Sequence, residues 1–211
     1  MNMAKKKEIN DEQEKWSETQ LKILMAFYPE AKQITLKEIQ NKTRLSYEPV
    51  YRNLCELAEK GIISSRKFGK TLVYSPNFEK DIVKSAFLLY AMKRARQFSK
   101  EYISLFSALK KISEEKSEII IIFGSYAKGN QRKDSDIDVL AVASKEDAKF
   151  LKNEIYALKH SSNKNFSPVI MPKSEFAKIK KENREFWRDL VSYGIIFKGY
   201  EPFYHYAYIE E

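Results

Sequence analysis

The run 119–142 constrains this chain more than any other, because it places two apolar segments on either side of a polar loop. The first segment ends in Gly124-Ser125, and the second begins at Asp136 and Asp138. A continuous apolar run bounded by turn residues predicts a strand buried on both faces. Side chains at positions i and i+2 of a strand project to the same face, so we expect the two carboxylates to converge.

These residue types predict a site for a divalent cation together with phosphate groups. The carboxylates of Asp136 and Asp138 are oxygen ligands of the kind that Mg²⁺ (or Mn²⁺) prefers, usually shared with substrate phosphates. Gly124 and Ser125 offer backbone N–H groups and a hydroxyl where a triphosphate can lie. We therefore expect a nucleoside triphosphate here, as substrate or as ligand.

The motif also resembles that of a known family. Gly124-Ser125-Tyr126-Ala127-Lys128-Gly129, followed by Ser135-Asp136-Ile137-Asp138, resembles the signature of the DNA polymerase β nucleotidyltransferase superfamily, and more narrowly its minimal prokaryotic domains. The resemblance covers about residues 117–200. It implies that Gly124 and Ser125 contact the triphosphate. It also implies that Asp136 and Asp138 hold the metal during attack of a hydroxyl on the α-phosphate, with pyrophosphate leaving.

Two residues of the loop allow alternative interpretations. Lys128 is a candidate for neutralising the triphosphate, and it is equally well explained as a solvated charge. Ser135 is a candidate nucleotide contact, and it is equally well explained as a support of the turn.

The chain departs from the family pattern at one position. Active members carry a third acidic residue on the strand after the helix, where it completes the metal site and accepts a proton. The predicted strand 166–171 contains no Asp or Glu, and Glu175 stands at a helix start, where the helix dipole explains it. Two functions stay open: transfer of a nucleotidyl group to an unknown acceptor, and nucleotide binding without efficient transfer.

The N-terminal part predicts a DNA-binding domain. Three short helices and then two β-prone runs around Phe68-Gly69-Lys70 are expected over 17–78. This order resembles the winged helix-turn-helix domains of prokaryotic transcription regulators, with protein binding as the alternative use. Basic and aromatic side chains of the third helix and the wing are the candidate DNA contacts. They are Arg44, Tyr47, Tyr51, Arg52, Arg66, Lys67 and Lys70.

Composition fits these assignments. The net charge is +9, with a calculated pI near 9.3, which favours a polyanionic partner such as DNA. A single cysteine excludes an intramolecular disulfide and is typical of a reducing compartment. No apolar run approaches the roughly 18 residues of a membrane-spanning helix. We expect a cytoplasmic protein with no membrane partner.

The predicted fold class is α+β, in four parts. They are a disordered tail at 1–16, a winged helix-turn-helix at 17–78, a helical connector at 79–116, and a nucleotidyltransferase domain at 117–211 with a mixed sheet flanked by helices. Helical connectors often mediate dimerisation, so a homodimer is one expectation. The family resemblance includes antitoxins that modify a partner toxin, so a toxin-like protein is another. The aromatic segment 200–208 is expected to cover the core.

Overall fold

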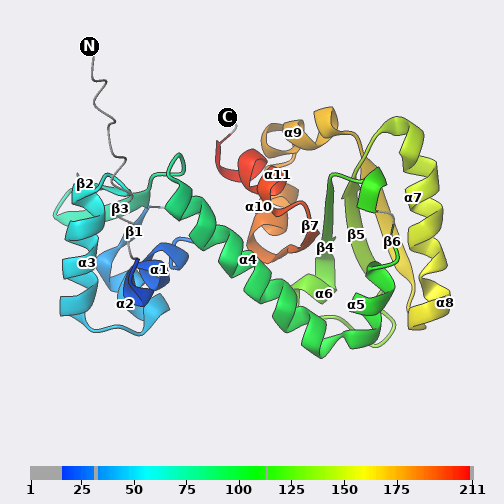
Figure 1. The fold of residues 1–211 in the computed structure, drawn as a ribbon, viewed down its shortest axis with the longest axis horizontal. Helices are drawn as coiled ribbons and strands as arrows, with labels where there is room; N and C mark the ends of the chain where they lie inside the picture. The colour runs from blue at the N-terminus through cyan, green and yellow to red at the C-terminus, as the bar shows by residue number, and fades with distance from the viewer. Residues whose placement is uncertain (1–15, 31–32, 113, 210–211) are drawn as a thin grey trace, which may run out of the picture.

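Two lobes are joined along one long helix, α4 (Asp81–Glu101), as Figure 1 shows. The structure is a computed structural model and describes residues 16–30, 33–112 and 114–209. The predicted disordered tail therefore lies outside the described residues, apart from Trp16.

The N-terminal lobe has the predicted order of three helices followed by a hairpin. Its elements are α1 (Glu18–Met25), β1 (Ile34–Thr35), α2 (Leu36–Thr43), α3 (Tyr47–Glu59), β2 (Ile63–Phe68) and β3 (Thr71–Pro76). Ser17 and Thr35 begin helices α1 and α2 with capping boxes. The short strand β1 adds to the hairpin, giving an antiparallel sheet of order β1-β3-β2. This arrangement is a winged helix-turn-helix.

The connector is a pair of helices. After α4, the chain breaks at Tyr102, whose backbone angles (φ −124°, ψ 60°) are not helical, and continues as α5 (Ile103–Leu109). A single turn of 3₁₀ helix, η1 (Glu114–Lys116), then leads into the second lobe. The sequence alone predicts helix here but does not locate the break.

The C-terminal lobe is a four-stranded mixed sheet flanked by helices. Its strands are β4 (Ile119–Phe123), β5 (Ile137–Val142), β6 (Phe166–Met171) and β7 (Ile195–Lys198), in the order β6-β5-β4-β7. Only β5 and β6 are parallel. Pro168 lies in the edge strand β6, as expected for a residue that cannot donate to a sheet. The helices are α6 (Gly124–Lys128), α7 (Lys145–Ala157), α8 (Lys159–Ser162), α9 (Lys173–Glu182), α10 (Arg184–Tyr193), α11 (Tyr200–Tyr204) and the π-helix η2 (His205–Ile209).

Alternation along β4 explains the two layers of helices. Ile119 and Ile121 belong to one core with side chains of α9, α10 and α11, whereas Ile120 and Ile122 belong to a second core with side chains of α5 and α7. All four isoleucines are fully buried, because both faces of this central strand are covered. Residues 173–193 form two helices, α9 and α10, because Asn183 interrupts the helical pattern and caps α10.

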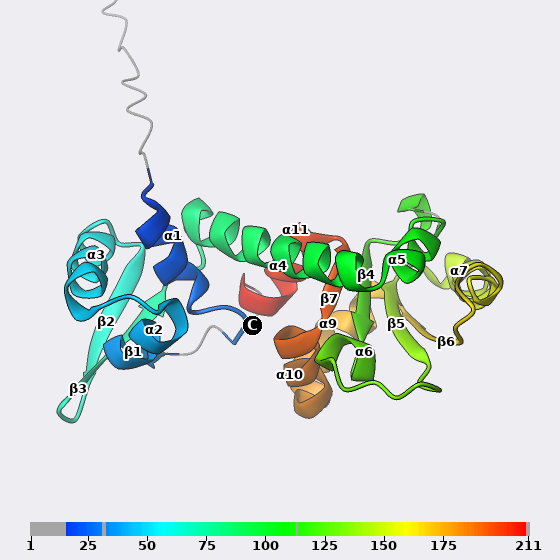
Figure 2. The ribbon, with the colours of Figure 1, turned by 90° about the horizontal axis from the view of Figure 1, so that it is seen from below.

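The C-terminal aromatic segment joins the two lobes. It covers the core, as predicted, with Tyr204 and Tyr206 buried. The hydroxyl of Tyr204 donates to the carbonyl of Phe78 (3.0 Å), and that of Tyr208 donates to the carbonyl of Pro29 (2.8 Å). Figure 2 shows this segment beside α4, between the lobes. One continuous hydrophobic core therefore includes residues of both.

Candidate functional site

The two halves of the Gly-Ser and Asp-x-Asp motif lie against each other at one end of the sheet. Strand β4 ends at Phe123, which pairs with Asp138 on β5. Gly124 follows with φ +69°, and a Cβ at this position would lie 2.0 Å from Oδ2 of Asp138. A side chain there would therefore overlap the carboxylate, and the left-handed backbone also favours glycine. Gly124 is thus required for the carboxylate to occupy this place.

The two carboxylates differ in environment. Asp136 is exposed, and Asp138 is half-buried. Burial raises the pKa of Asp138, the charge of Asp136 raises it further, and a hydrogen bond with Ser167 opposes both effects. Two neighbouring carboxylates that repel each other are stabilised by a divalent cation. The oxygen ligands of this pair therefore fit Mg²⁺ or Mn²⁺.

Ser167 is the site residue that sequence reasoning missed. In the parallel pairing of β5 with β6 it is the register partner of Asp138, and its side chain lies close enough to lower the pKa of that carboxyl. Within the described ranges, no three or more His, Cys, Asp or Glu residues are grouped so as to hold a metal ion. The neighbour of Asp138 on β6 is thus a hydroxyl, at a place where a carboxylate could complete a metal site.

The structure places the other two loop candidates in definite contacts. Nζ of Lys128 lies 2.6 Å from Oδ2 of Asp189 on α10, and this interaction raises the pKa of Lys128. The hydroxyl of Ser135 accepts a hydrogen bond from the backbone N–H of Arg132 (2.8 Å), and the Ser135 N–H donates to the Arg132 carbonyl (3.1 Å). Ser135 therefore supports the turn, which was one of its two predicted roles.

The seven candidate DNA contacts are all exposed and belong to one lobe. Tyr47 and Tyr51, one turn apart on α3, stack with ring centroids 5.6 Å apart and an interplanar angle of 9°. Arg52 is next to Tyr51 on the same helix. Arg44 ends α2 in a left-handed conformation (φ 59°). The basic wing residues lie on β2 and in the turn to β3, where Phe68, which sequence reasoning missed, is 74% exposed.

Comparisons with known proteins agree with both lobes. The model of the penicillinase repressor family matches residues 16–121, half of the chain. The chain belongs to the penicillinase repressor family. The model of the nucleotidyltransferase domain matches residues 104–197, so a nucleotidyltransferase domain follows the repressor part. The two matches overlap from α5 to the start of β4, where the lobes are connected.

One solved structure, a crystal structure of a toxin-antitoxin with AMP-PNP, is also similar. It is 18% identical, with a TM-score of 0.35, and the match covers 50% of this chain and 80% of that one. No curated protein matches the sequence.

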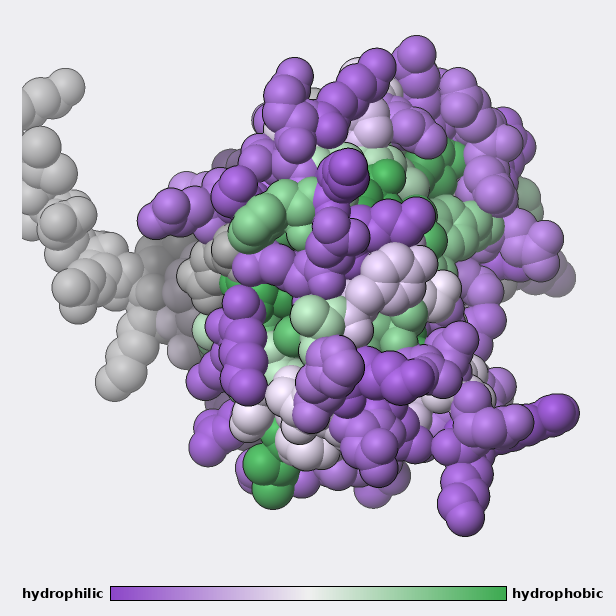
Figure 3. Space-filling view, turned by 90° about the vertical axis from the view of Figure 1, so that its right-hand side faces the viewer, coloured by the Kyte–Doolittle hydropathy of each residue, from purple (hydrophilic) through white to green (hydrophobic). Residues whose placement is uncertain are grey.

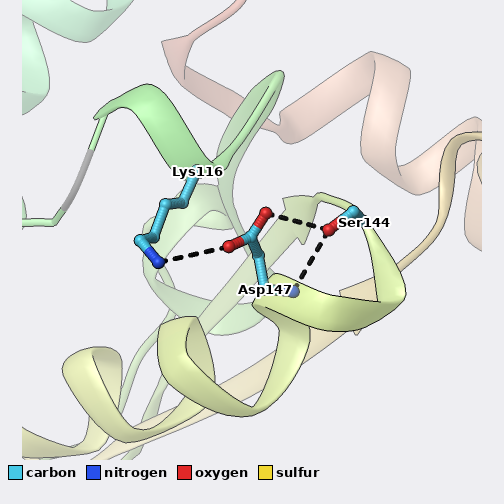
Figure 4. A network of polar contacts seen from close by, with 3 residues as sticks. All are labelled: Lys116, Ser144 and Asp147. Carbon is cyan, nitrogen blue, oxygen red and sulfur yellow. Dashed lines mark hydrogen bonds and ion pairs between the residues drawn. The ribbon is translucent and has the colours of Figure 1, made fainter.

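A second polar cluster in this repressor-family chain lies at the opposite end of the sheet. There the Asp147 carboxylate accepts from the hydroxyl of Ser144 (2.8 Å) and from Nζ of Lys116 (3.2 Å), as Figure 4 shows. The Ser144 hydrogen bond and then Lys116 hold the pKa of Asp147 below its usual range. Ser144 caps α7, so the cluster is explained by the start of that helix.

The surface at the end of the nucleotidyltransferase domain that is far from the winged helix is mostly polar. Figure 3, which faces the far end of the nucleotidyltransferase domain, shows hydrophilic residues with smaller hydrophobic patches between them. No helix among the described residues is long and apolar enough to cross a membrane.

Proposed function

We propose that this protein is a DNA-binding regulator whose nucleotidyltransferase domain binds a Mg²⁺–nucleoside triphosphate without efficient transfer. The observation that carries the proposal is Ser167, which stands beside Asp138 on β6. A serine hydroxyl is not ionised at neutral pH, so it neither adds a negative ligand to a metal pair nor accepts a proton as a carboxylate does. Binding of a metal–nucleotide does not need the third carboxylate that transfer needs. The residues that would bind it, Asp136 and Asp138 with Gly124 and Ser125, are present.

In this proposal each site residue has a defined role. Asp136 and Asp138 hold Mg²⁺ (or Mn²⁺), and the bound cation would neutralise phosphate charge. Gly124 leaves room for the Asp138 carboxylate, and the first turn of α6, with Ser125, offers N–H groups to the phosphates. Because the pKa of Asp138 is raised without metal, a cation would compete with a proton for this carboxylate, and its binding should strengthen as pH rises through that pKa.

The winged helix would bind DNA through the seven exposed candidates. Arg66, Lys67 and Lys70 in the wing would neutralise phosphates, which gives affinity without sequence information. Tyr47, Tyr51 and Arg52 are placed on the exposed face of α3, where side chains can reach base edges. Arg44, which lies between α2 and α3, would contact DNA at the edge of the same surface. A gel shift with the region upstream of the protein's own gene at low salt tests this part, and no shift would refute it.

The experiment that tests the nucleotide part restores the missing carboxylate. Binding of each NTP with Mg²⁺ is measured for wild type and for Asp136→Asn/Asp138→Asn, and pyrophosphate release is measured for wild type and Ser167→Asp. We expect wild type to bind without release, the double variant to lose binding, and Ser167→Asp to gain release. Ser167→Asn is the matched control, since it is of similar size and carries no charge. Binding that survives the double variant would refute the site.

Transfer by the wild type is the second candidate function. The retained Asp136/Asp138 pair favours it, together with the intact approach of Gly124 to Asp138. In this case the molecule that receives the nucleotidyl group, such as a partner protein, would have to carry its own proton-accepting group or a hydroxyl with a lowered pKa. Incorporation of label from an α-phosphate-labelled NTP into an acceptor, lost in Asp138→Asn, would establish transfer.

A further inference from the structure

Helix α10 contacts the candidate nucleotide site at two points. In its first turn, the ring of Phe186 packs edge-on against Phe123, the residue before Gly124, with centroids 5.5 Å apart. One turn further on, Asp189 forms the ion pair with Lys128 at the end of α6. The side chains of this pair are only about one-third exposed (33% and 39%), so water screens them incompletely. A movement of α6 or of the end of β4 would therefore change the contacts that these elements make with α10.

The other end of α10 is held by the connector helix α4. The two terminal nitrogens of Arg94 donate to the carbonyls of Ser192 (3.3 Å) and Tyr193 (2.7 Å), which end α10. A cation is favourable at this place, because the last carbonyls of a helix have no partners within it. The end of the helix is also close-packed, since a Cβ at Gly194 would lie 2.3 Å from the carbonyl oxygen of Leu190.

The same arginine reaches the winged-helix lobe. Burial raises the pKa of Tyr28, and the nearby positive charge of Arg94 partly offsets that rise. Tyr28 is 6% exposed and packs against Phe87 and Tyr90 of α4. Arg94, which is half-buried, therefore lies on α4 between the end of α10 and Tyr28 of the N-terminal lobe.

We infer that α10 couples nucleotide binding to the position of the winged helix, and that the Lys128–Asp189 ion pair is the contact that changes. The inference rests on the proposed function. Lys128 is one turn from Ser125 on the same short helix, so a bound triphosphate offers its ammonium a partner that competes with Asp189. When Lys128 turns to phosphate, α10 loses its charged contact with α6, and Arg94 transmits the change to Tyr28.

Coupling of this kind is reciprocal. If nucleotide changes DNA affinity by some factor, DNA changes nucleotide affinity by the same factor, typically about 5–150-fold. The Lys128–Asp189 pair is one element with two arrangements, and each site favours one of them. Breaking the pair by mutation should therefore reproduce the effect of nucleotide.

The test uses Asp189→Asn, which keeps the size of the side chain and removes its charge. DNA affinity is measured with a duplex of the upstream region, with and without each NTP and Mg²⁺. Trp187 on α10 is buried against Phe176 and Phe203 and reports repacking by its fluorescence once Trp16→Phe removes the other tryptophan. We expect nucleotide-free Asp189→Asn to match nucleotide-bound wild type in both readouts, and to bind nucleotide at least as tightly.

Two further variants separate the possible results. Glu118→Gln breaks the Lys173–Glu118 ion pair (2.9 Å) at the opposite end of the sheet and should behave as wild type. Arg94→Gln should bind nucleotide as wild type does and lose the response of DNA affinity. Absence of nucleotide binding in wild type would refute the proposed function itself. Nucleotide binding that leaves DNA affinity unchanged, or an unchanged response in Asp189→Asn, would overturn the coupling alone.

Discussion

Gly124→Ala tests the close approach that defines the site. The new Cβ would lie 2.0 Å from Oδ2 of Asp138, and real Cβ contacts are essentially never below 3.0 Å. The carboxylate must therefore move by about 1 Å or rotate away, since the backbone of β4 and β5 is fixed by pairing. Because the overlapping atom is the end of a flexible side chain, the overlap itself costs little stability. The main effect should be a displaced Asp138 carboxylate at the metal site.

The substitution should lower both the stability of the protein and its affinity for Mg²⁺–NTP, by different amounts. Alanine in the left-handed conformation (φ +69°) should lower the free energy of unfolding by roughly 1–2 kcal/mol. Displacement of a metal-binding carboxylate should weaken Mg²⁺–NTP binding by about 10–100-fold, the usual cost of disturbing the support of a metal ligand. Urea denaturation measures the first effect, and titration with a fluorescent NTP analogue in Mg²⁺ measures the second.

Gly129→Ala is the matched control. Gly129 also has a left-handed backbone (φ +72°), at the end of the same helix, but nothing lies within 4 Å of its Cβ position. It should lose the same stability and keep its nucleotide affinity. If the two alanine variants bind Mg²⁺–NTP equally well, the argument that Gly124 makes room for the Asp138 carboxylate is refuted.

Three further predictions follow from other contacts. Asp138→Asn should raise the free energy of unfolding at neutral pH without metal, as measured by urea titration. A carboxyl whose pKa is raised by folding lowers the stability of the folded state as pH rises through that pKa. The stability gained by Asp138→Asn should therefore vanish at acidic pH, where the carboxyl is protonated. Lys67→Ala should weaken DNA binding for all sequences and lower the salt slope by about 1, whereas an unchanged slope would remove Lys67 from the interface. Tyr208→Phe should lower the free energy of unfolding by about 1 kcal/mol by removing the hydrogen bond to Pro29, with Tyr193→Phe, exposed, as the control.

Local features were the ones that the sequence predicted well. The three short helices of the N-terminal part, two of which start at the capping residues Ser17 and Thr35, and the two apolar strands follow from interactions within a few residues. The positions of the breaks at Tyr102 and Asn183 were not predicted, because the apolar pattern runs through both. A change in helix direction depends on what the next helix packs against, and that is not written in the local pattern.

The sequence by itself predicted the nucleotidyltransferase and winged helix-turn-helix domains, the fold class and the residue types of the candidate site. Glycine, serine and two aspartates at fixed spacing are close in the chain, so strand and turn geometry alone brings them together. Only the tertiary structure decided their neighbours. Ser167 meets Asp138 through the register of two parallel strands, Asp189 meets Lys128 across 61 positions, and Tyr208 meets Pro29 across 179. Such pairs depend on how whole elements pack, because no local preference links residues so far apart.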